Sequence, residues 1–172
     1  QFSEGDWILL QNEIANVDCA IEYAHARKLR VALNPSPFDD VISRCNLNYV
    51  DMLLINEVEG AELTGAAEPE QILSILRTQY MNLSVLLTLG EHGAIFVDSQ
   101  GIRYHVPSVP CVVKDTTAAG DTFTGYFLTS YFKDYDVSRA LAIAAAASSI
   151  AVSREGAASS IPYQCEVLTY MK

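Results

Sequence analysis

The sequence predicts an α/β protein with a mostly parallel central sheet. Short continuous apolar runs, such as Trp7–Gln11, are typical of strands that are buried on both faces. Between these runs lie segments with apolar residues at helical spacing, such as residues 16–27. Strands that alternate with helices form βαβ units, so we expect consecutive strands to run parallel.

In the first half of the chain, each predicted strand is followed by a helix. Asp18 lies in the first turn of the first predicted helix, and Pro69 lies at an early position where a helix tolerates proline. The Asn34-Pro35-Ser36-Pro37 segment ends a strand. The predicted strands are 7–11, 31–33, 52–55 and 84–89, and the predicted helices are 16–27, 39–45, 56–63 and 68–79.

The second half begins with two strands and continues with helices. Ser99-Gln100-Gly101 predicts a hairpin turn between strands 94–98 and 102–106, which adds an antiparallel element. The predicted helices that follow are 120–132, 137–152 and 161–172, with a loop at 154–160. Since no internal repeat or linker is visible, residues 1–172 are predicted to form a single domain.

The composition argues against several classes of partner. The chain has 172 residues and a net charge of −10, without a cluster of Lys and Arg, which disfavours nucleic acids and anionic membranes. Its four cysteines are far apart and form no Cys-x-x-Cys pair, as expected in a reducing compartment. The longest apolar run, 141–152, is too short to cross a bilayer. We therefore expect a cytoplasmic protein, and the first residue, Gln rather than Met, suggests a fragment or a processed product.

The stretch 114–123 (Lys-Asp-Thr-Thr-Ala-Ala-Gly-Asp-Thr-Phe) is placed where a loop becomes a helix. The first turn of a helix has unpaired N–H groups, and small side chains let an anion approach them. Asp121 would place a carboxylate beside that anion, where it could take a proton from an attacking hydroxyl. The alternative is ordinary N-capping by this stretch, with Ala-Ala-Gly at a close helix crossing.

This stretch resembles the second diagnostic motif of the ribokinase-like (PfkB) carbohydrate kinases, Asp-Thr-x-Gly/Ala-Ala-Gly-Asp-Thr-Phe. The resemblance implies a three-layer αβα sandwich with a mostly parallel central sheet. It also implies that Asp121 is the catalytic base and contacts the sugar hydroxyl, while the main chain of Ala118, Ala119 and Gly120 forms an anion hole.

A second string, Asn56-Glu57-Val58-Glu59, follows a predicted strand and opens a helix. Its spacing is also that of a helix cap, with Glu59 as the partner of Asn56 in a capping box. The string resembles the family's Asn-x-x-Glu motif, which implies that Asn56 and Glu59 help to place Mg²⁺ and phosphate, mostly through water.

Three further strings resemble the family in the same order along the chain. Residues 88–93 (Thr88, Leu89, Gly90, Glu91, His92 and Gly93) resemble the motif that lines the nucleotide together with Gly120, although such a string is a β-turn in most proteins. His92 lies at a variable position and is expected to be exposed. Glu13, after the first strand, resembles a sugar-binding glutamate, although it could be a solvated carboxylate at a strand end. Asn34-Pro35-Ser36-Pro37 resembles a family turn.

The string 151–162 resembles the C-terminal loop of ribokinases, where oxygens hold a monovalent cation beside the anion hole. The alternative is an ordinary Gly-containing loop. The resemblance implies a K⁺ site whose ligands come mostly from the main chain: Asp115, Thr117, Ala151, Arg154, Gly156 and Ser160. The sequence departs from the family at Ala145, where relatives often place Asn or His near the adenine.

The resemblance implies ATP-dependent phosphorylation of a primary hydroxyl of a sugar such as ribose, with ATP, Mg²⁺ and K⁺ as cofactors. The family's N-terminal portion, which carries sugar-binding residues and a lid, has no counterpart here. The sequence therefore leaves open a non-catalytic nucleotide-binding module derived from a sugar kinase. It also leaves open the choice of sugar and a homodimer of the full-length protein.

Overall fold

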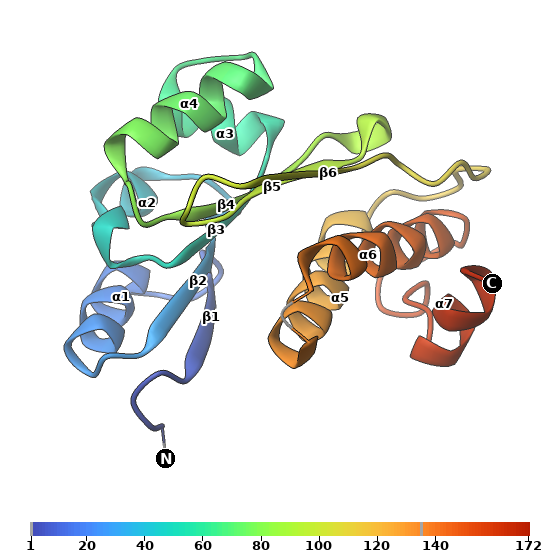
Figure 1. Ribbon diagram of the computed structural model, residues 1–172, viewed down its shortest axis with the longest axis horizontal. Helices are drawn as coiled ribbons and strands as arrows, with labels where there is room; N and C mark the ends of the chain where they lie inside the picture. The colour runs from blue at the N-terminus through green and yellow to red at the C-terminus, as the bar shows by residue number, and fades with distance from the viewer. Residues whose placement is uncertain (1, 135) are drawn as a thin grey trace. The chain divides into compact units, whose positions relative to one another are not determined.

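The computed structural model describes residues 2–134 and 136–172, which form an α/β fold (Figure 1). The first elements are β1 (Trp7–Gln11), α1 (Val17–Ala26), β2 (Arg30–Asn34), α2 (Asp40–Arg44), the 3₁₀ helix η1 (Leu47–Tyr49), β3 (Met52–Asn56), α3 (Glu57–Thr64), α4 (Pro69–Gln79) and β4 (Ser84–Thr88). They are followed by the 3₁₀ helix η2 (Gly90–His92), β5 (Ala94–Val97), β6 (Arg103–Val106), α5 (Ala119–Asp134), α6 (Val137–Val152) and α7 (Gln164–Tyr170).

The described strands form a six-stranded sheet in the order β1-β2-β3-β4-β5-β6. The pairs β1–β2, β2–β3 and β3–β4 are parallel, which confirms the predicted α/β class. Gln11 is in register with Asn34, and Asn56 is in register with Thr88. The polar residues that end these strands therefore lie along one edge of the sheet, where ligands bind in open α/β sheets.

The chain divides into two compact units, one of residues up to Thr88 with Ile95–Arg103, the other of Leu89–Ala94 with Tyr104–Lys172. In the first unit, successive parallel strands are neighbours, and since such crossovers are right-handed in nearly all proteins, their helices are expected on the same face. Figure 1 shows α1 to α4, coloured blue to green, on that face. Leu53, Val85 and Leu87 on the central strands are fully buried.

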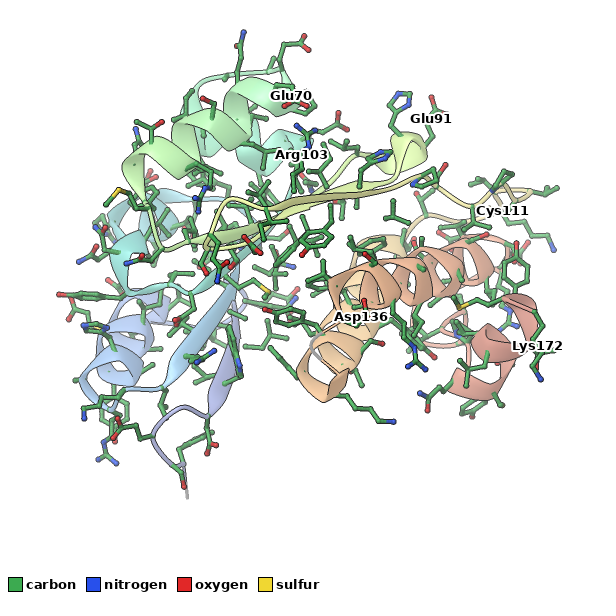
Figure 2. The ribbon with its side chains drawn as sticks, viewed as in Figure 1. Glu70, Glu91, Arg103, Cys111, Asp136 and Lys172 are labelled. Carbon is green, nitrogen blue, oxygen red and sulfur yellow. The ribbon has the colours of Figure 1, made fainter. Side chains whose placement is uncertain are left out.

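The predicted turn between β5 and β6 is confirmed in the first unit. The N–H group of Asp98 donates to the carbonyl of Ile102 at 3.0 Å, and that of Gly101 donates back to Asp98 at 2.9 Å. Glu70 in the first turn of α4 and Arg103 at the start of β6 point toward each other (Figure 2). Two contacts of 2.5 Å join the guanidinium of Arg103 to the carboxylate of Glu70. This pair joins α4 to the first residue of β6.

The second unit is built on α5 and α6, which pack closely because α6 is rich in alanine. Ala140, Ala144 and Ala147 are fully buried. On another side of α6, Ile143 and Ile150 pack with Val167 of α7. No helix of the described residues is long and apolar enough to cross a membrane.

One predicted element needs correction. The closing helix is Gln164–Tyr170 and not residues 161–172, because Tyr163 has extended backbone angles and Pro162 disfavours helical angles at the residue before it. The short 3₁₀ helices η1 and η2 were not predicted, since both lie in segments that the sequence marks only as loops.

Candidate active site

The turn that leads into α5 presents main-chain N–H groups without acceptors. The helix begins at Ala119, whose N–H group donates to the carbonyl of Thr116 at 3.1 Å. Within the part of the chain that the structure describes, the N–H groups of Ala118, Gly120 and Asp121 donate to no protein acceptor. Of the three residues predicted to form an anion hole, Ala118 and Gly120 thus have free donors, and Ala119 uses its own within the turn.

Gly120 and Asp121 leave this turn open to a ligand. A Cβ atom built on Gly120 would meet no atom within 4 Å, so packing gives no reason for a glycine there. The side chain of Asp121 is exposed and has no hydrogen bond or ion pair with the described residues. A free carboxylate beside free N–H groups at the positive end of a helix is suited to an anion and a hydroxyl that reacts with it.

The carboxylate of Asp115 accepts hydrogen bonds from this turn and from the loop after α6. One oxygen accepts from the N–H group of Thr117 at 2.9 Å and from its hydroxyl at 2.5 Å, and the other accepts from the N–H group of Gly156 at 3.0 Å. The hydroxyl and N–H of Thr117, with the N–H of Gly156, hold the pKa of Asp115 below its ordinary value. Asp115 therefore ties the turn to the loop after α6.

Asp115→Asn is expected to lower the melting temperature at neutral pH, because an amide nitrogen would face one of these donors. A carboxylate with a lowered pKa contributes its stability above its ordinary pKa of 3.8 and loses it as the pH falls through the folded pKa. The difference in melting temperature between wild type and variant should therefore shrink below about pH 3.8. Calorimetry between pH 3 and 7, with Asp40→Asn at an exposed helix start as the control, would test this. A difference that is equal at all pH values would contradict it.

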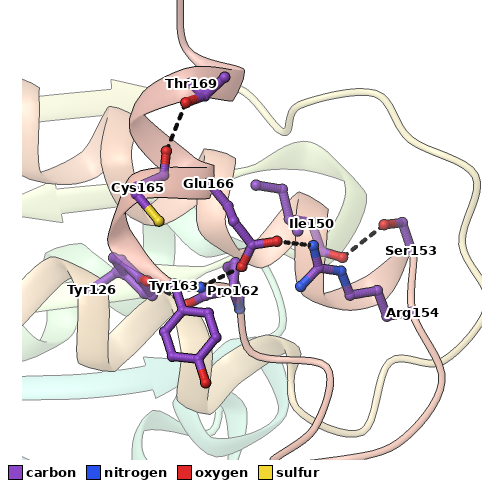
Figure 3. Close-up of polar contacts among 9 residues, drawn as sticks. All are labelled: Tyr126, Ile150, Ser153, Arg154, Pro162, Tyr163, Cys165, Glu166 and Thr169. Atoms are coloured by element: carbon purple, nitrogen blue, oxygen red, sulfur yellow. Dashed lines mark hydrogen bonds and ion pairs between the residues drawn. The ribbon is translucent and has the colours of Figure 1, made fainter.

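The loop after α6 is fixed by an ion pair and a turn (Figure 3). Arg154 Nη2 contacts Glu166 Oε1 at 2.6 Å, and Glu166 Oε2 accepts from the N–H group of Tyr163 at 2.7 Å. Ser160 is buried and donates both its N–H group and its hydroxyl to the carbonyl of Ala157. The loop thus has a defined path between α6 and α7.

The predicted cation ligands offer main-chain oxygens. In the described residues, the carbonyls of Thr117, Arg154 and Gly156 accept no hydrogen bond, whereas that of Ala151 accepts from the N–H group of Arg154. Both carboxylate oxygens of Asp115 already accept hydrogen bonds. Free carbonyl oxygens fit a monovalent cation such as K⁺. No described group of three His, Cys, Asp or Glu residues could hold a metal ion.

Asn56 and Glu59 form the capping box that was the alternative interpretation of their spacing. The side chain of Asn56 accepts from the N–H group of Glu59, and the Glu59 carboxylate accepts from that of Asn56, each at 2.9 Å. Glu59 is buried, while Asn56 is exposed at the carboxyl end of β3. One oxygen of Glu59 remains without a partner among the described residues. The role of both residues at Mg²⁺ stays a prediction.

The string that resembles a nucleotide motif folds as a tight turn after β4. The N–H group of Leu89 donates to the carbonyl of Gly93 at 2.8 Å, and η2 lies between them. Glu91 and His92 are exposed, as expected for His92. The hydroxyl of Ser108 donates to the carbonyl of Glu91 and holds the turn against the segment after β6.

The predicted residues fall in both compact units. Glu13, Asn56, Glu59 and Thr88 lie in the first unit, and the others lie in the second. Glu13 is exposed in the loop after β1, where its neighbour Asn12 donates to the carbonyl of Pro37 at 2.7 Å. Ala145 is buried on α6. The convergence of the two groups on one site stays a prediction.

The sequence matches the model of a known family and several of its members. The model of the pfkB family of carbohydrate kinases matches residues 3–164. A ribokinase of Haemophilus influenzae is 31% identical over 100% of this chain and 58% of its own length. A ribokinase of Schizosaccharomyces pombe is 35% identical over 93% of this chain and 53% of its own length. The chain thus spans somewhat more than half of these relatives.

The fold matches solved ribokinases as well. An Arabidopsis thaliana ribokinase complexed with ribose and ATP superimposes with a TM-score of 0.82 at 29% identity, over 96% of this chain and 55% of that one. A Thermotoga maritima ribokinase gives a TM-score of 0.78 at 29% identity, over 96% and 56%. On the extent of these matches, the chain belongs to the pfkB family of carbohydrate kinases.

Proposed function

We propose that this chain is the nucleotide-binding and catalytic portion of a kinase that transfers the γ-phosphoryl group of ATP to a primary hydroxyl of ribose or a related sugar. The observation that carries the proposal is the start of α5, where free N–H groups at Ala118, Gly120 and Asp121 adjoin the unpaired carboxylate of Asp121. The complex of the Arabidopsis relative with ribose and ATP supports this choice of substrates. The alternative of a non-catalytic module gains no support from the family.

In the proposed reaction, Asp121 accepts the proton of the sugar hydroxyl as its oxygen bonds to the γ-phosphorus. The bond from that phosphorus to the bridging oxygen breaks, and ADP leaves with the electron pair. The free N–H groups and the dipole of α5 stabilise the charge on the transferred group. Little covalent chemistry is required of the protein, so that positioning and electrostatics supply most of the rate.

Two cations complete the proposal. Mg²⁺, when bound, would neutralise charge on the β- and γ-phosphates, with Asn56 and Glu59 beside it, mostly through water. K⁺ would lie beside the turn, held mostly by main-chain oxygens of Asp115, Thr117, Ala151, Arg154, Gly156 and Ser160. In the second unit, residues 89–93 would line the nucleotide, and in the first, Thr88 would do so and Glu13 would reach the sugar.

The direct test is a coupled assay of ADP release on the full-length protein with ribose, fructose, 2-keto-3-deoxygluconate and nucleosides. We expect phosphoryl transfer to ribose that depends on Mg²⁺ and increases with K⁺. Binding of ATP without transfer to any sugar would overturn the proposed activity and leave only the nucleotide site.

Gly120→Ala is expected to leave the protein folded and lower kcat by about 100-fold. Its methyl group would meet no described atom, so it should keep or raise the melting temperature, but it would occupy the approach to a free N–H group. The matched control is Gly125→Ala on the same helix, where a Cβ also meets nothing within 4 Å. Both variants should stabilise α5 by up to about 1 kcal/mol, and only Gly120→Ala should lose turnover. Equal turnover in the two variants would count against an anion at this turn.

A further inference from the structure

A serine on α6 contacts the main chain of the turn at α5. The hydroxyl of Ser148 donates to the carbonyl of Ala119 at 3.1 Å, and Ser148 is half-buried. Ala119 is the first residue of α5. The contact joins residues that are 29 positions apart in the sequence, and both lie in the second unit.

This contact acts on one of the free N–H groups through peptide geometry. The carbonyl of Ala119 and the N–H group of Gly120 belong to one planar peptide unit. That carbonyl accepts a hydrogen bond within α5, and the hydroxyl of Ser148 adds a second one, which further restrains the direction in which the N–H group of Gly120 points. Gly120 has no side chain, and the space around its Cα is open, so that no side-chain packing supplies the same restraint.

The serine is carried by a rigid element. Three alanines of α6 are fully buried, at positions 140, 144 and 147, which keeps this helix close to its neighbours. The peptide before the one that Ser148 holds is restrained separately, since the N–H group of Ala119 donates to Thr116. The two contacts hold both sides of Ala119.

We propose that Ser148 is a positioning residue that aims the N–H group of Gly120 at the phosphoryl group. This inference rests on the proposed kinase function. Ser148 would act through this peptide unit and not on the substrate itself. Its effect should appear mainly in kcat, because donors that are directed at charge developing in the transition state contribute more there than in the bound ground state.

The adjacent serine provides a matched control. Ser149 lies on the same helix and is buried, and its hydroxyl lies 3.5 Å from the hydroxyl of Tyr170 on α7. Ser149→Ala deletes one serine hydroxyl from α6, as Ser148→Ala does, but the lost contact is with α7 and not with the turn at α5. A general weakening of α6 would affect both variants alike.

The test compares Ser148→Ala, Ser148→Thr and Ser149→Ala in the full-length protein by kcat, by KM for ATP and by the NMR order parameter of the Gly120 N–H bond. We expect Ser148→Ala to lower kcat by about three- to ten-fold and to change KM by less than about two-fold. The order parameter of the Gly120 N–H bond should fall from about 0.85, the value of rigid backbone, toward about 0.6. Ser148→Thr keeps the hydroxyl and should restore kcat. Ser149→Ala should leave kcat and this order parameter as in wild type.

Two outcomes would overturn the proposal: wild-type kcat and order parameter in Ser148→Ala, or equal losses in Ser149→Ala. If the wild-type protein phosphorylates no sugar, the proposed function fails. The order parameter of the Gly120 N–H bond then still decides whether Ser148 orders the turn, so the two failures are distinguishable.

Discussion

Asp121→Asn is expected to lower kcat in the full-length protein by about 10²- to 10⁴-fold, the usual contribution of a general base. The side chain of Asp121 is exposed and forms no hydrogen bond or ion pair with a described residue. The loss of its carboxylate should therefore not be offset by a second acid bonded to it. Asparagine has nearly the same size but cannot accept the proton of the hydroxyl at neutral pH. Steady-state assays of phosphoryl transfer to ribose would measure the effect.

Stability must be measured beside activity, because Asp121 also lies in the first turn of α5. A carboxylate there interacts favourably with the helix dipole by about 0.3–1 kcal/mol. Asp18→Asn removes a carboxylate from the first turn of α1 and is the matched control. Both variants should melt within a few degrees of wild type, and only Asp121→Asn should lose turnover. Near-normal turnover in Asp121→Asn would remove this residue as the base.

The sequence predicted the elements whose signals are local. Trp7–Gln11 and Val137–Val152 have the predicted bounds, because a bounded apolar run and a long alanine-rich helical repeat leave few alternatives. The start of α1 was less evident. Asn16 makes no side-chain cap and adopts left-handed backbone angles, so the helix begins one residue later, at Val17.

The sequence indicated which residues to propose for the candidate site, but not the contacts that hold these residues in place. Small residues before an Asp at a helix start indicated an anion site at 118–121. Nothing in the local spacing indicated that the Asp115 carboxylate would accept from Gly156, 41 residues away, or that Arg154 would pair with Glu166. Such contacts depend on how α5, α6 and α7 pack, and packing is decided by the whole core and not by neighbouring residues.

The capping box at Asn56 and Glu59 illustrates how one spacing can serve two purposes. The three-residue interval that satisfies the first N–H groups of α3 also places both side chains at the carboxyl end of β3. The structure confirms the cap, and the cap fixes the Glu59 carboxylate in one orientation. A residue held in this way is pre-organised for a ligand on its remaining oxygen, which is why the cap and the proposed Mg²⁺ role are compatible.

Gly93→Ala is expected to destabilise the protein by more than about 4 kcal/mol, the largest loss of stability that the fold predicts. A Cβ atom there would lie 2.0 Å from the carbonyl oxygen of Val106 and 2.7 Å from the carbonyl carbon of Pro107. Both are main-chain atoms that cannot rotate away. Gly93 also has φ of 91° and ψ of −134°, a region open almost only to glycine.

Gly65→Ala separates the steric clash of a Cβ atom from the strain of a positive φ. Gly65 ends α3 with a positive φ of 74°, but a Cβ atom there would meet nothing within 4 Å. It should therefore cost only the backbone strain, about 1–2 kcal/mol. Thermal unfolding should show Gly93→Ala melting at least about 10 °C below wild type, or failing to fold. The melting temperature of Gly65→Ala should lie between those of wild type and Gly93→Ala. If the two variants were equally stable, the close approach of the Leu89–Gly93 turn to the end of β6 would be wrong, and with it the shape of the turn that is proposed to line the nucleotide.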